Sequence, residues 1–284
     1  MWCLSGKEKL AAALLFTFIV AVYVCFVQNT VFVYDDFEQI ESIRAELSVS
    51  KLKLIFGSSH YSNFSYYRPL CRLLLNIEKL AFGNNPWIYR LFNSCLVAGI
   101  ALLVYLLLIK QKNRFNFWIN ILIPLCIAFH PISAEMVYII TCQEVLLVVL
   151  FSILTCYFFY KDKKILSGIC LYLALLSREN AFVVPAIIFL FLWLVKKSGF
   201  KFTLKATSYL FVIDILYLIQ RFLVLTGSST GDKELSAIGP LLSYVYMVQN
   251  ILFPSIDLLY EPSTETWLCL EYTIPTIVII ICSV

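Results

Sequence analysis

The chain has 284 residues, of which 61% are apolar and 14% are charged, and its formal net charge is +4. Soluble globular domains contain about 45–50% apolar and about 25% charged residues. With a mean hydropathy of +0.86, the composition excludes a soluble domain and a disordered tail. It also excludes a nucleic-acid-binding domain, because the basic residues fall in short clusters between apolar runs. We therefore expect an all-α, polytopic integral membrane protein.

The first apolar run reaches residue 34 without a charge and follows Lys7 and Lys9. It exceeds the roughly 7–15 residues of a signal-peptide core, so we expect an uncleaved first helix over residues 10–30. Further candidate spans follow within residues 87–226, which we expect to form a helical bundle. These are Leu91–Ile109, Phe115–Ala134, Val145–Tyr160, Ile165–Ser177, Asn180–Val195 and, with one aspartate, Ala206–Gln220.

The basic clusters between these runs predict the orientation. If the chain alternates across the membrane, the clusters at residues 7–9, 110–114, 161–164 and 196–205 fall on one side, and Glu8 and Asp162 are their only acids. Short basic loops face the cytoplasm. The N-terminus is therefore expected in the cytoplasm, in either the endoplasmic reticulum or the bacterial inner membrane.

Residues 31–86 then form one long non-cytoplasmic loop, with helices expected over 38–56 and 66–82. Residues 235–256 are apolar between acidic flanks, which favours a re-entrant segment within a non-cytoplasmic stretch (227–272) over an eighth span. Residues 273–284 begin an apolar run that is too short to span, so we expect an incomplete last helix in a C-terminally truncated domain.

Two of the apolar runs are short for a bilayer. Ile165–Ser177 would rise about 20 Å as a helix, whereas the hydrocarbon core is roughly 30 Å thick. The run ends at Arg178 and Glu179, and the run from residue 115 ends at His130. We expect these ends to lie below the membrane surface and to line a cavity, because ionisable residues at such depth are usually functional.

The densest acidic group opens the long loop, where Asp35, Asp36 and Glu38 follow Tyr34. Adjacent carboxylates repel one another and raise at least one pKa, as a general base requires. An equally good interpretation is a solvated loop start whose acids stabilise the N-terminus of the next helix.

The arginines and the histidine also allow two interpretations each. Arg68 precedes Pro69 and should be non-helical, so its guanidinium could bind phosphate, or it could be an interfacial arginine among tyrosines. Arg178 and Glu179 could bind substrate or pair with each other. His130 could be a ligand or a helix cap. With two histidines in the chain, we expect no histidine-based metal site.

In this order, the polar segments resemble those of the multi-spanning GT-C glycosyltransferases. The closest branch is the TPR-coupled O-mannosyltransferases and their bacterial relatives, and the resemblance covers roughly residues 10–260. It rests on Tyr-Asp-Asp (34–36), Tyr-Arg-Pro-Leu (67–70), Phe-Gly-Asn-Asn-Pro-Trp-Ile-Tyr (82–89), Phe-His-Pro-x-x-x-Glu (129–135), Leu-Ser-Arg-Glu-Asn-Ala-x-x-x-Pro (176–185), Arg-Phe-x-Val-Leu (221–225) and Leu-Phe-Pro (252–254).

The resemblance implies a GT-C-like bundle that transfers a sugar, mannose in most relatives, from a polyprenyl or dolichyl phosphate. The acceptor is a hydroxyl of a protein, glycan or lipid on the non-cytoplasmic side, and the anomeric centre inverts. It implies that Asp35 is the base and that Asp36 supports it. The implied binding set for the donor phosphate and the substrates is Arg68, Arg178, Arg221, His130, Glu135, Glu179, Glu38 and Arg90.

The implied reaction needs no nucleotide cofactor, and its other partners are membrane lipids, with no nucleic acid. The chain departs from the family pattern, which commonly has His at Arg90, Lys at Arg178 and Arg near Gln143. Two alternatives therefore stay open. One is an inactive or truncated GT-C-like scaffold, and the other is a lipid or solute transporter.

Overall fold

The computed structural model describes residues 5–28, 30–33, 36–43, 45–46, 48–58, 66–109 and 116–225. These residues belong to the first of two compact units of the chain, Met1–Thr230. The predictions for Asp35, for the re-entrant segment within 227–272 and for the incomplete helix 273–284 lie outside the described residues.

The described residues form helices and connecting turns, with no β-strand among them. Three short helical turns interrupt the α-helices: η1 (Ile140–Cys142) and η2 (Glu179–Phe182) are 3₁₀-helical, and η3 (Phe191–Val195) is π-helical. The α-helices are α1 (Gly6–Val27), α2 (Asp36–Ser42), α3 (Val49–Gly57), α4 (Pro69–Phe82), α5 (Pro86–Ile109), α6 (Phe117–Ala128), α7 (Pro131–Tyr138), α8 (Gln143–Tyr160), α9 (Lys164–Ser177), α10 (Val183–Leu190) and α11 (Phe200–Leu225).

Within the described part of the chain, four helical segments are long and apolar enough to cross a membrane, namely α1, α5, η1 with α8, and α11. The pair α6 and α7, which is bent by 49°, makes a fifth if it counts as one span. The described residues confirm the prediction of an all-α structure, and the length and composition of these helices agree with the prediction of several membrane-spanning segments. Ile165–Ser177, which is short in the sequence, is indeed a shorter apolar helix, Lys164–Ser177. The other short run, from residue 115, forms the bent pair α6 and α7. The expected span Asn180–Val195 is also a shorter apolar helix, Glu179–Val195. The side on which the N-terminus lies stays a prediction.

Local sequence signals explain where several helices begin. Ser5 and Glu8 form a capping box at the start of α1, with each side chain accepting a hydrogen bond from the backbone of the other. Pro69 is the first residue of α4, where its missing N–H costs nothing. Arg68 before it has φ −134° and ψ 61°, which confirms that this residue is not helical.

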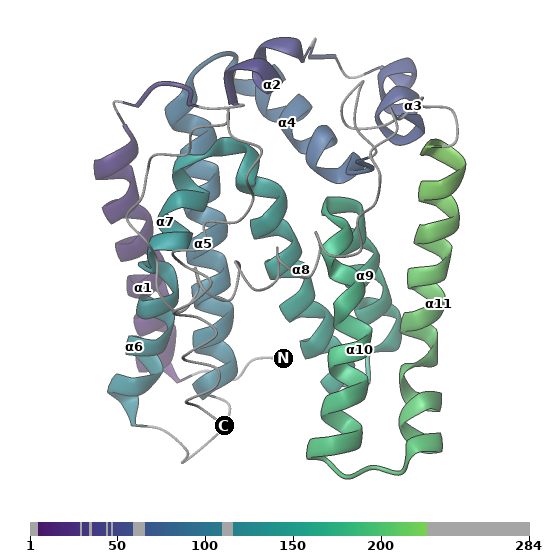
Figure 1. Cartoon of the computed structure of the whole chain (residues 1–284). Coiled ribbons are helices and arrows are strands. Elements are labelled where there is room, and N and C mark those ends of the chain that lie inside the picture. Colours follow the sequence, from purple (N-terminus) through teal and green to yellow (C-terminus); the bar gives the residue numbers. More distant parts are fainter. Residues whose placement is uncertain are drawn as a thin grey trace, which may run out of the picture. The chain divides into compact units, whose positions relative to one another are not determined.

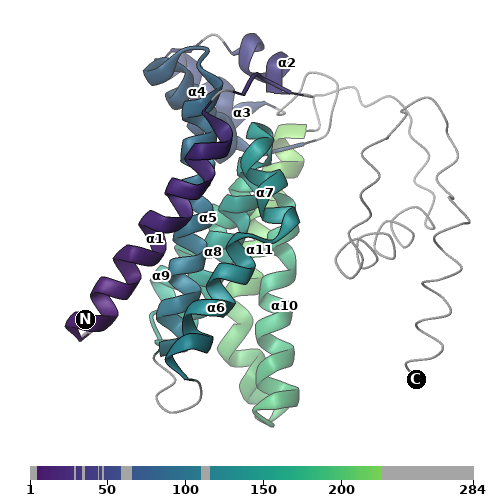
Figure 2. The ribbon, with the colours of Figure 1, turned by 90° about the vertical axis from the view of Figure 1, so that its left-hand side faces the viewer.

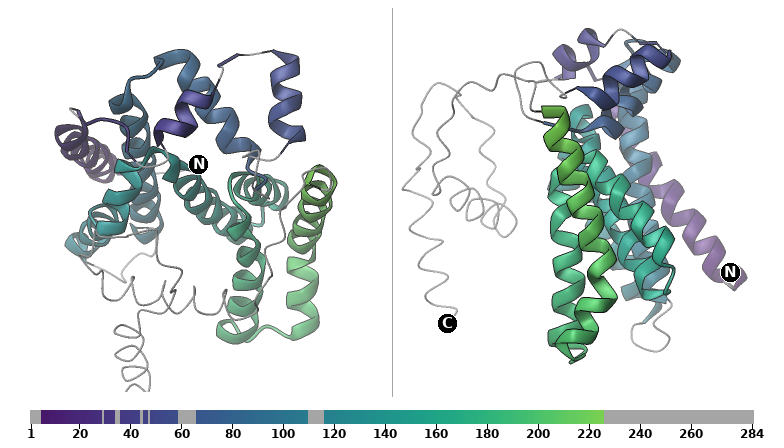
Figure 3. Two further views of the ribbon diagram at one scale, coloured as in Figure 1. Left: turned by 45° about the horizontal axis from the view of Figure 1, so that its top comes forward. Right: turned by 90° about the vertical axis from the view of Figure 1, so that its right-hand side faces the viewer.

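The helices surround two apolar cores. One joins α1, α5, α6 and α7, and the other joins α9, α10 and α11 with Tyr67. Helix α8 contacts both α5 and α9 and therefore connects the two groups (Figure 1). Helix α11 runs alongside α9 and α10, as the two views in Figure 3 show.

Helices α2, α3 and α4 lie across one end of the bundle (Figure 2). A third, smaller core lies beneath them and includes Ile40, Leu75, Tyr89 and Ile140. The expected single helix over residues 38–56 is instead two helices, α2 and α3. The break arises because Ser48 caps a new helix, with its hydroxyl oxygen accepting a hydrogen bond from the Lys51 N–H at 3.1 Å.

Candidate functional site

Three groups of buried polar side chains meet at the segment Ile140–Glu144, which we call the junction segment. It comprises η1 and the first turn of α8, at the end of the bundle that α2 and α4 cover (Figure 1). Asp36 binds its backbone, Glu78 binds the Gln143 side chain, and Arg68 binds the Glu144 side chain. Residues far apart in the sequence are thus gathered on one short stretch of chain.

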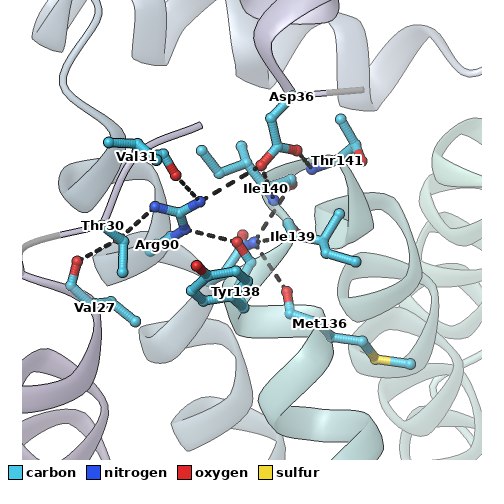
Figure 4. Close-up of polar contacts among 11 residues, drawn as sticks. Val27, Thr30, Val31, Asp36, Arg90, Met136, Tyr138, Ile139, Ile140 and Thr141 are labelled. Atoms are coloured by element: carbon cyan, nitrogen blue, oxygen red, sulfur yellow. Dashed lines mark hydrogen bonds and ion pairs between the residues drawn. The ribbon is translucent and has the colours of Figure 1, made fainter. Parts of the chain in front are cut away.

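The first group contains Asp36 and Arg90, both of which are 0% exposed. The Asp36 carboxylate accepts hydrogen bonds from the N–H groups of Ile140 at 3.1 Å and Thr141 at 3.0 Å. An Arg90 nitrogen lies 3.8 Å from the same carboxylate (Figure 4). Burial raises the pKa of Asp36, whereas the two N–H groups and Arg90 oppose the rise.

Arg90 uses the rest of its guanidinium to connect α5 to two other segments. It donates to the carbonyl oxygens of Val31 and Tyr138, both at 2.6 Å, and to the Thr30 hydroxyl (Figure 4). Its guanidinium carbon also lies 4.7 Å from the centroid of the Tyr138 ring. Each of these contacts is internal, and together they hold the chain after α1 against α5 and α7. Substrate binding by Arg90 stays a prediction.

The second group pairs Glu78 of α4 with Gln143. The Gln143 amide donates to one Glu78 carboxylate oxygen at 2.8 Å, and both residues are buried. The other Glu78 oxygen and the Gln143 carbonyl oxygen are buried and have no hydrogen-bond partner among the described residues. Burial raises the pKa of Glu78 from its ordinary value of 4.5 to about 7. A charged Glu78 is therefore costly in the folded protein.

We expect Glu78→Gln to stabilise the protein more at about pH 8 than at about pH 5. Between the ordinary Glu78 pKa of 4.5 and the raised pKa of about 7, the folded state binds more protons than the unfolded state. The stability of the wild type therefore falls as the pH rises through this range. The pKa shift corresponds to about 3 kcal/mol at most. A glutamine also brings an N–H donor to a site that holds an unpaired acceptor. Thermal unfolding of purified protein across this pH range measures the difference.

The matched control is Glu41→Gln, which neutralises an exposed carboxylate on α2. Its unfolding temperature should follow that of the wild type at each pH. If the unfolding temperature of Glu78→Gln differs from that of the wild type by the same amount at both pH values, the pKa of Glu78 is not raised.

The third group is centred on Arg68. Its guanidinium donates to both Glu144 carboxylate oxygens, at 2.6 and 2.8 Å, and to both Glu179 oxygens, at 3.1 and 3.3 Å. The Arg178 Nη1 atom lies 3.2 Å from the Glu144 Oε1 atom, so Arg178 adds a second positive charge to the group. Burial would lower the pKa of Arg68, but the two carboxylates raise it above its ordinary value. We call Arg68, Glu144, Arg178 and Glu179 the charged quartet.

The residue before Arg68 fixes its position against α11. The Tyr217 hydroxyl donates to the Tyr67 carbonyl oxygen at 3.1 Å, and the Gln220 amide donates to the Tyr67 hydroxyl oxygen at 2.7 Å. The Tyr66 ring covers the guanidinium, with its centroid 4.3 Å from the Arg68 guanidinium carbon. The ordered Tyr-Tyr-Arg-Pro sequence thus presents Arg68 to α8 and η2 from the start of α4.

The other predicted residues lie around the quartet or away from it. Arg221 near the end of α11 is close enough to Glu179 to interact with it electrostatically. His130 caps α7, with its Nδ1 accepting from the Ile132 N–H at 3.2 Å. Glu135 is exposed on α7 and makes no ion pair with a described residue. The Glu38 side chain lies outside the described part of the structure.

Sequence reasoning missed Glu144 and Glu78. Glu144 directly precedes the apolar run that was counted from Val145. An acid at the start of a predicted span was the signal that could have identified it. Glu78 gave no such signal, since an acid on a loop helix is usually solvated. Where the structure is described, no three His, Cys, Asp or Glu side chains are placed to hold a metal ion.

Comparison with known proteins gives no relative of this chain: no protein family, no curated protein and no solved structure matches it. The chemistry of the site must therefore be inferred from its own residues. The two arginines and two carboxylates of the quartet form a nearly neutral, partly buried group. Guanidinium groups in such surroundings bind phosphate and carboxylate oxygens strongly.

Proposed function

We propose that the chain is a membrane glycosyltransferase of the GT-C type. It transfers a sugar, mannose in the first instance, from a polyprenyl or dolichyl phosphate to an acceptor hydroxyl, with inversion at the anomeric carbon. The observation that supports the proposal best is the meeting of separate sequence motifs at the junction segment. Tyr-Asp-Asp, Tyr-Arg-Pro-Leu and Ser-Arg-Glu-Asn each contribute a charged residue there.

In the proposed reaction, the Asp35 carboxylate takes the proton of the acceptor hydroxyl. The acceptor oxygen attacks the anomeric carbon while the bond from that carbon to the phosphate oxygen breaks. The lipid phosphate leaves with the electron pair and gains negative charge, which a preorganised guanidinium stabilises. Asp36, whose carboxylate accepts hydrogen bonds from the N–H groups of Ile140 and Thr141, has the supporting role in this proposal.

Arg178 is the arginine of the quartet best placed to meet a phosphate. Its side chain is 31% exposed, whereas that of Arg68 is 9% exposed and is bound by two carboxylates. The Arg178 Nε is buried and has no hydrogen-bond partner among the described residues, so the exposed part of the guanidinium is the part that a phosphate can reach. We propose that Arg178 contacts the leaving phosphate directly and that Arg68 holds Glu144 and Glu179 in place beside it.

The test is sugar transfer in membranes that contain the full chain. Wild type should transfer label from radiolabelled dolichyl-phosphate mannose to acceptors in a membrane extract. Asp35→Asn should lower the rate by about 10²–10⁴-fold, the usual contribution of a general base. Asp162→Asn removes an exposed aspartate from the turn between α8 and α9 and should transfer at the wild-type rate.

The same assay separates the alternatives. Equal transfer by wild type and Asp35→Asn would exclude Asp35 as the base. Absence of transfer by correctly inserted wild type, from both mannose and glucose donors, would favour the inactive scaffold. Movement of lipid or solute across the membrane without a glycosyl product would favour a transporter.

A further inference from the structure

A groove of about 700 Å³ runs between α9 and α11, away from the charged quartet. Its apolar lining includes Ile165, Ile169 and Ile213. At Gly168 the two helices approach so closely that an added Cβ atom would lie 2.9 Å from the Ile213 Cδ1 atom. The absence of a side chain at Gly168 thus leaves room for the Ile213 side chain, which also lines the groove.

One end of the groove is positively charged. Lys164 and Lys205 line it, both are exposed, and neither makes an ion pair with a described residue. Lys164 belongs to the turn Lys161–Lys164, which contains three lysines and one acid, Asp162. Ser208 and Tyr209 also line the groove, where the Ser208 hydroxyl donates to the Lys205 carbonyl oxygen at 3.1 Å and the Tyr209 hydroxyl is buried. This end therefore offers two cations to a single anionic group.

The dimensions of the groove match one leaflet of a bilayer. Its lining on α9 extends from Lys164 to Leu173, which corresponds to a rise of about 14 Å. Half of the hydrocarbon core is about 15 Å thick. The charged end therefore lies at headgroup level when α9 and α11 stand in a membrane, and the apolar part lies beside the acyl chains.

We infer that this groove binds an anionic phospholipid from the leaflet on the side of the basic loops. The phosphate lies between the ammonium groups of Lys164 and Lys205, and an acyl chain follows Ile165 and Ile169. Basic pockets between membrane helices bind anionic headgroups in this way. A polyprenyl phosphate fits less well, since its chain is much longer than the groove and its proposed site lies at the opposite end of α9.

The test measures lipid binding to the purified full chain in detergent by native mass spectrometry. Phosphatidylglycerol and phosphatidylcholine with identical acyl chains are titrated in turn. Each of the two lysines near the headgroup contributes about a fivefold preference, so wild type should prefer phosphatidylglycerol about 25-fold. Lys164→Gln combined with Lys205→Gln should abolish the preference. The matched control, Lys161→Gln with Lys196→Gln, removes the same charge beyond the groove lining and should retain it.

A second variant keeps the lysines and fills the groove. Ser208→Phe places a ring in the lining and should reduce the binding of both phospholipids. Equal binding of the two phospholipids by wild type, or equal loss of the preference in both double variants, would overturn the inference. The inference would also be overturned if polyprenyl phosphate displaced bound phosphatidylglycerol at a lower concentration than added phosphatidylglycerol does.

Discussion

Arg90→Leu is expected to destabilise the protein by about 3–5 kcal/mol, the usual cost of leaving one partner of a buried ion pair uncompensated. The variant would leave the fully buried Asp36 carboxylate without its cation. It would also remove the donor from the carbonyl oxygens of Val31 and Tyr138. Thermal or denaturant unfolding of the purified protein, followed by intrinsic fluorescence, measures the loss.

The matched control for Arg90 is the double variant Arg90→Leu with Asp36→Asn. It removes the buried charge together with its partner, so part of the lost stability should return. The asparagine oxygen can still accept a hydrogen bond from the Ile140 or Thr141 N–H. If Arg90→Leu unfolds at the wild-type temperature, the buried pair does not stabilise this end of the bundle.

Arg68→Ala is expected to cost about 3–5 kcal/mol of stability as well, because it leaves Glu144 and Glu179 facing one another without their shared cation. It should also abolish sugar transfer in the assay proposed above. Arg68→Lys keeps the charge but cannot form both bidentate contacts, so we expect an intermediate stability. Unfolding measurements should rank the wild type as most stable, Arg68→Lys as intermediate and Arg68→Ala as least stable.

The Arg178→Ala variant distinguishes a loss of stability from a loss of sugar transfer within the quartet. The Arg178 side chain is 31% exposed and contacts Glu144 at 3.2 Å, so its removal should cost about 1 kcal/mol or less. Transfer should nevertheless fall strongly if Arg178 meets the leaving phosphate. An Arg178→Ala variant with full transfer activity would assign the phosphate contact to another residue.

The sequence predicted most helices because long apolar runs leave few other structures open to the chain in a membrane. It predicted their ends less well. The first helix is expected to reach residue 30, yet α1 ends at Val27. The reason is a tertiary contact, in which Arg90 binds Thr30 and Val31 and holds this part of the chain outside the helix.

The sequence indicated several individual residues of the site but not which of them contact one another. Arg68 and the Arg178–Glu179 pair stood out as polar tips between apolar runs, and the structure places them together. Their partner Glu144 did not stand out, because the pairing depends on how the helices pack. Arg68 lies 76 positions from Glu144 and 111 positions from Glu179. No local spacing rule relates residues so far apart.

The junction segment also bears on how this chain can change in evolution. Its backbone is held by Asp36, and its side chains at Gln143 and Glu144 are held from α4 and its N-terminal cap. A substitution in one of these three attachments alters the position that the other two require. We therefore expect substitutions in the junction segment to be accompanied by substitutions at Asp36, Glu78 or Arg68 among proteins that descend from a common ancestor.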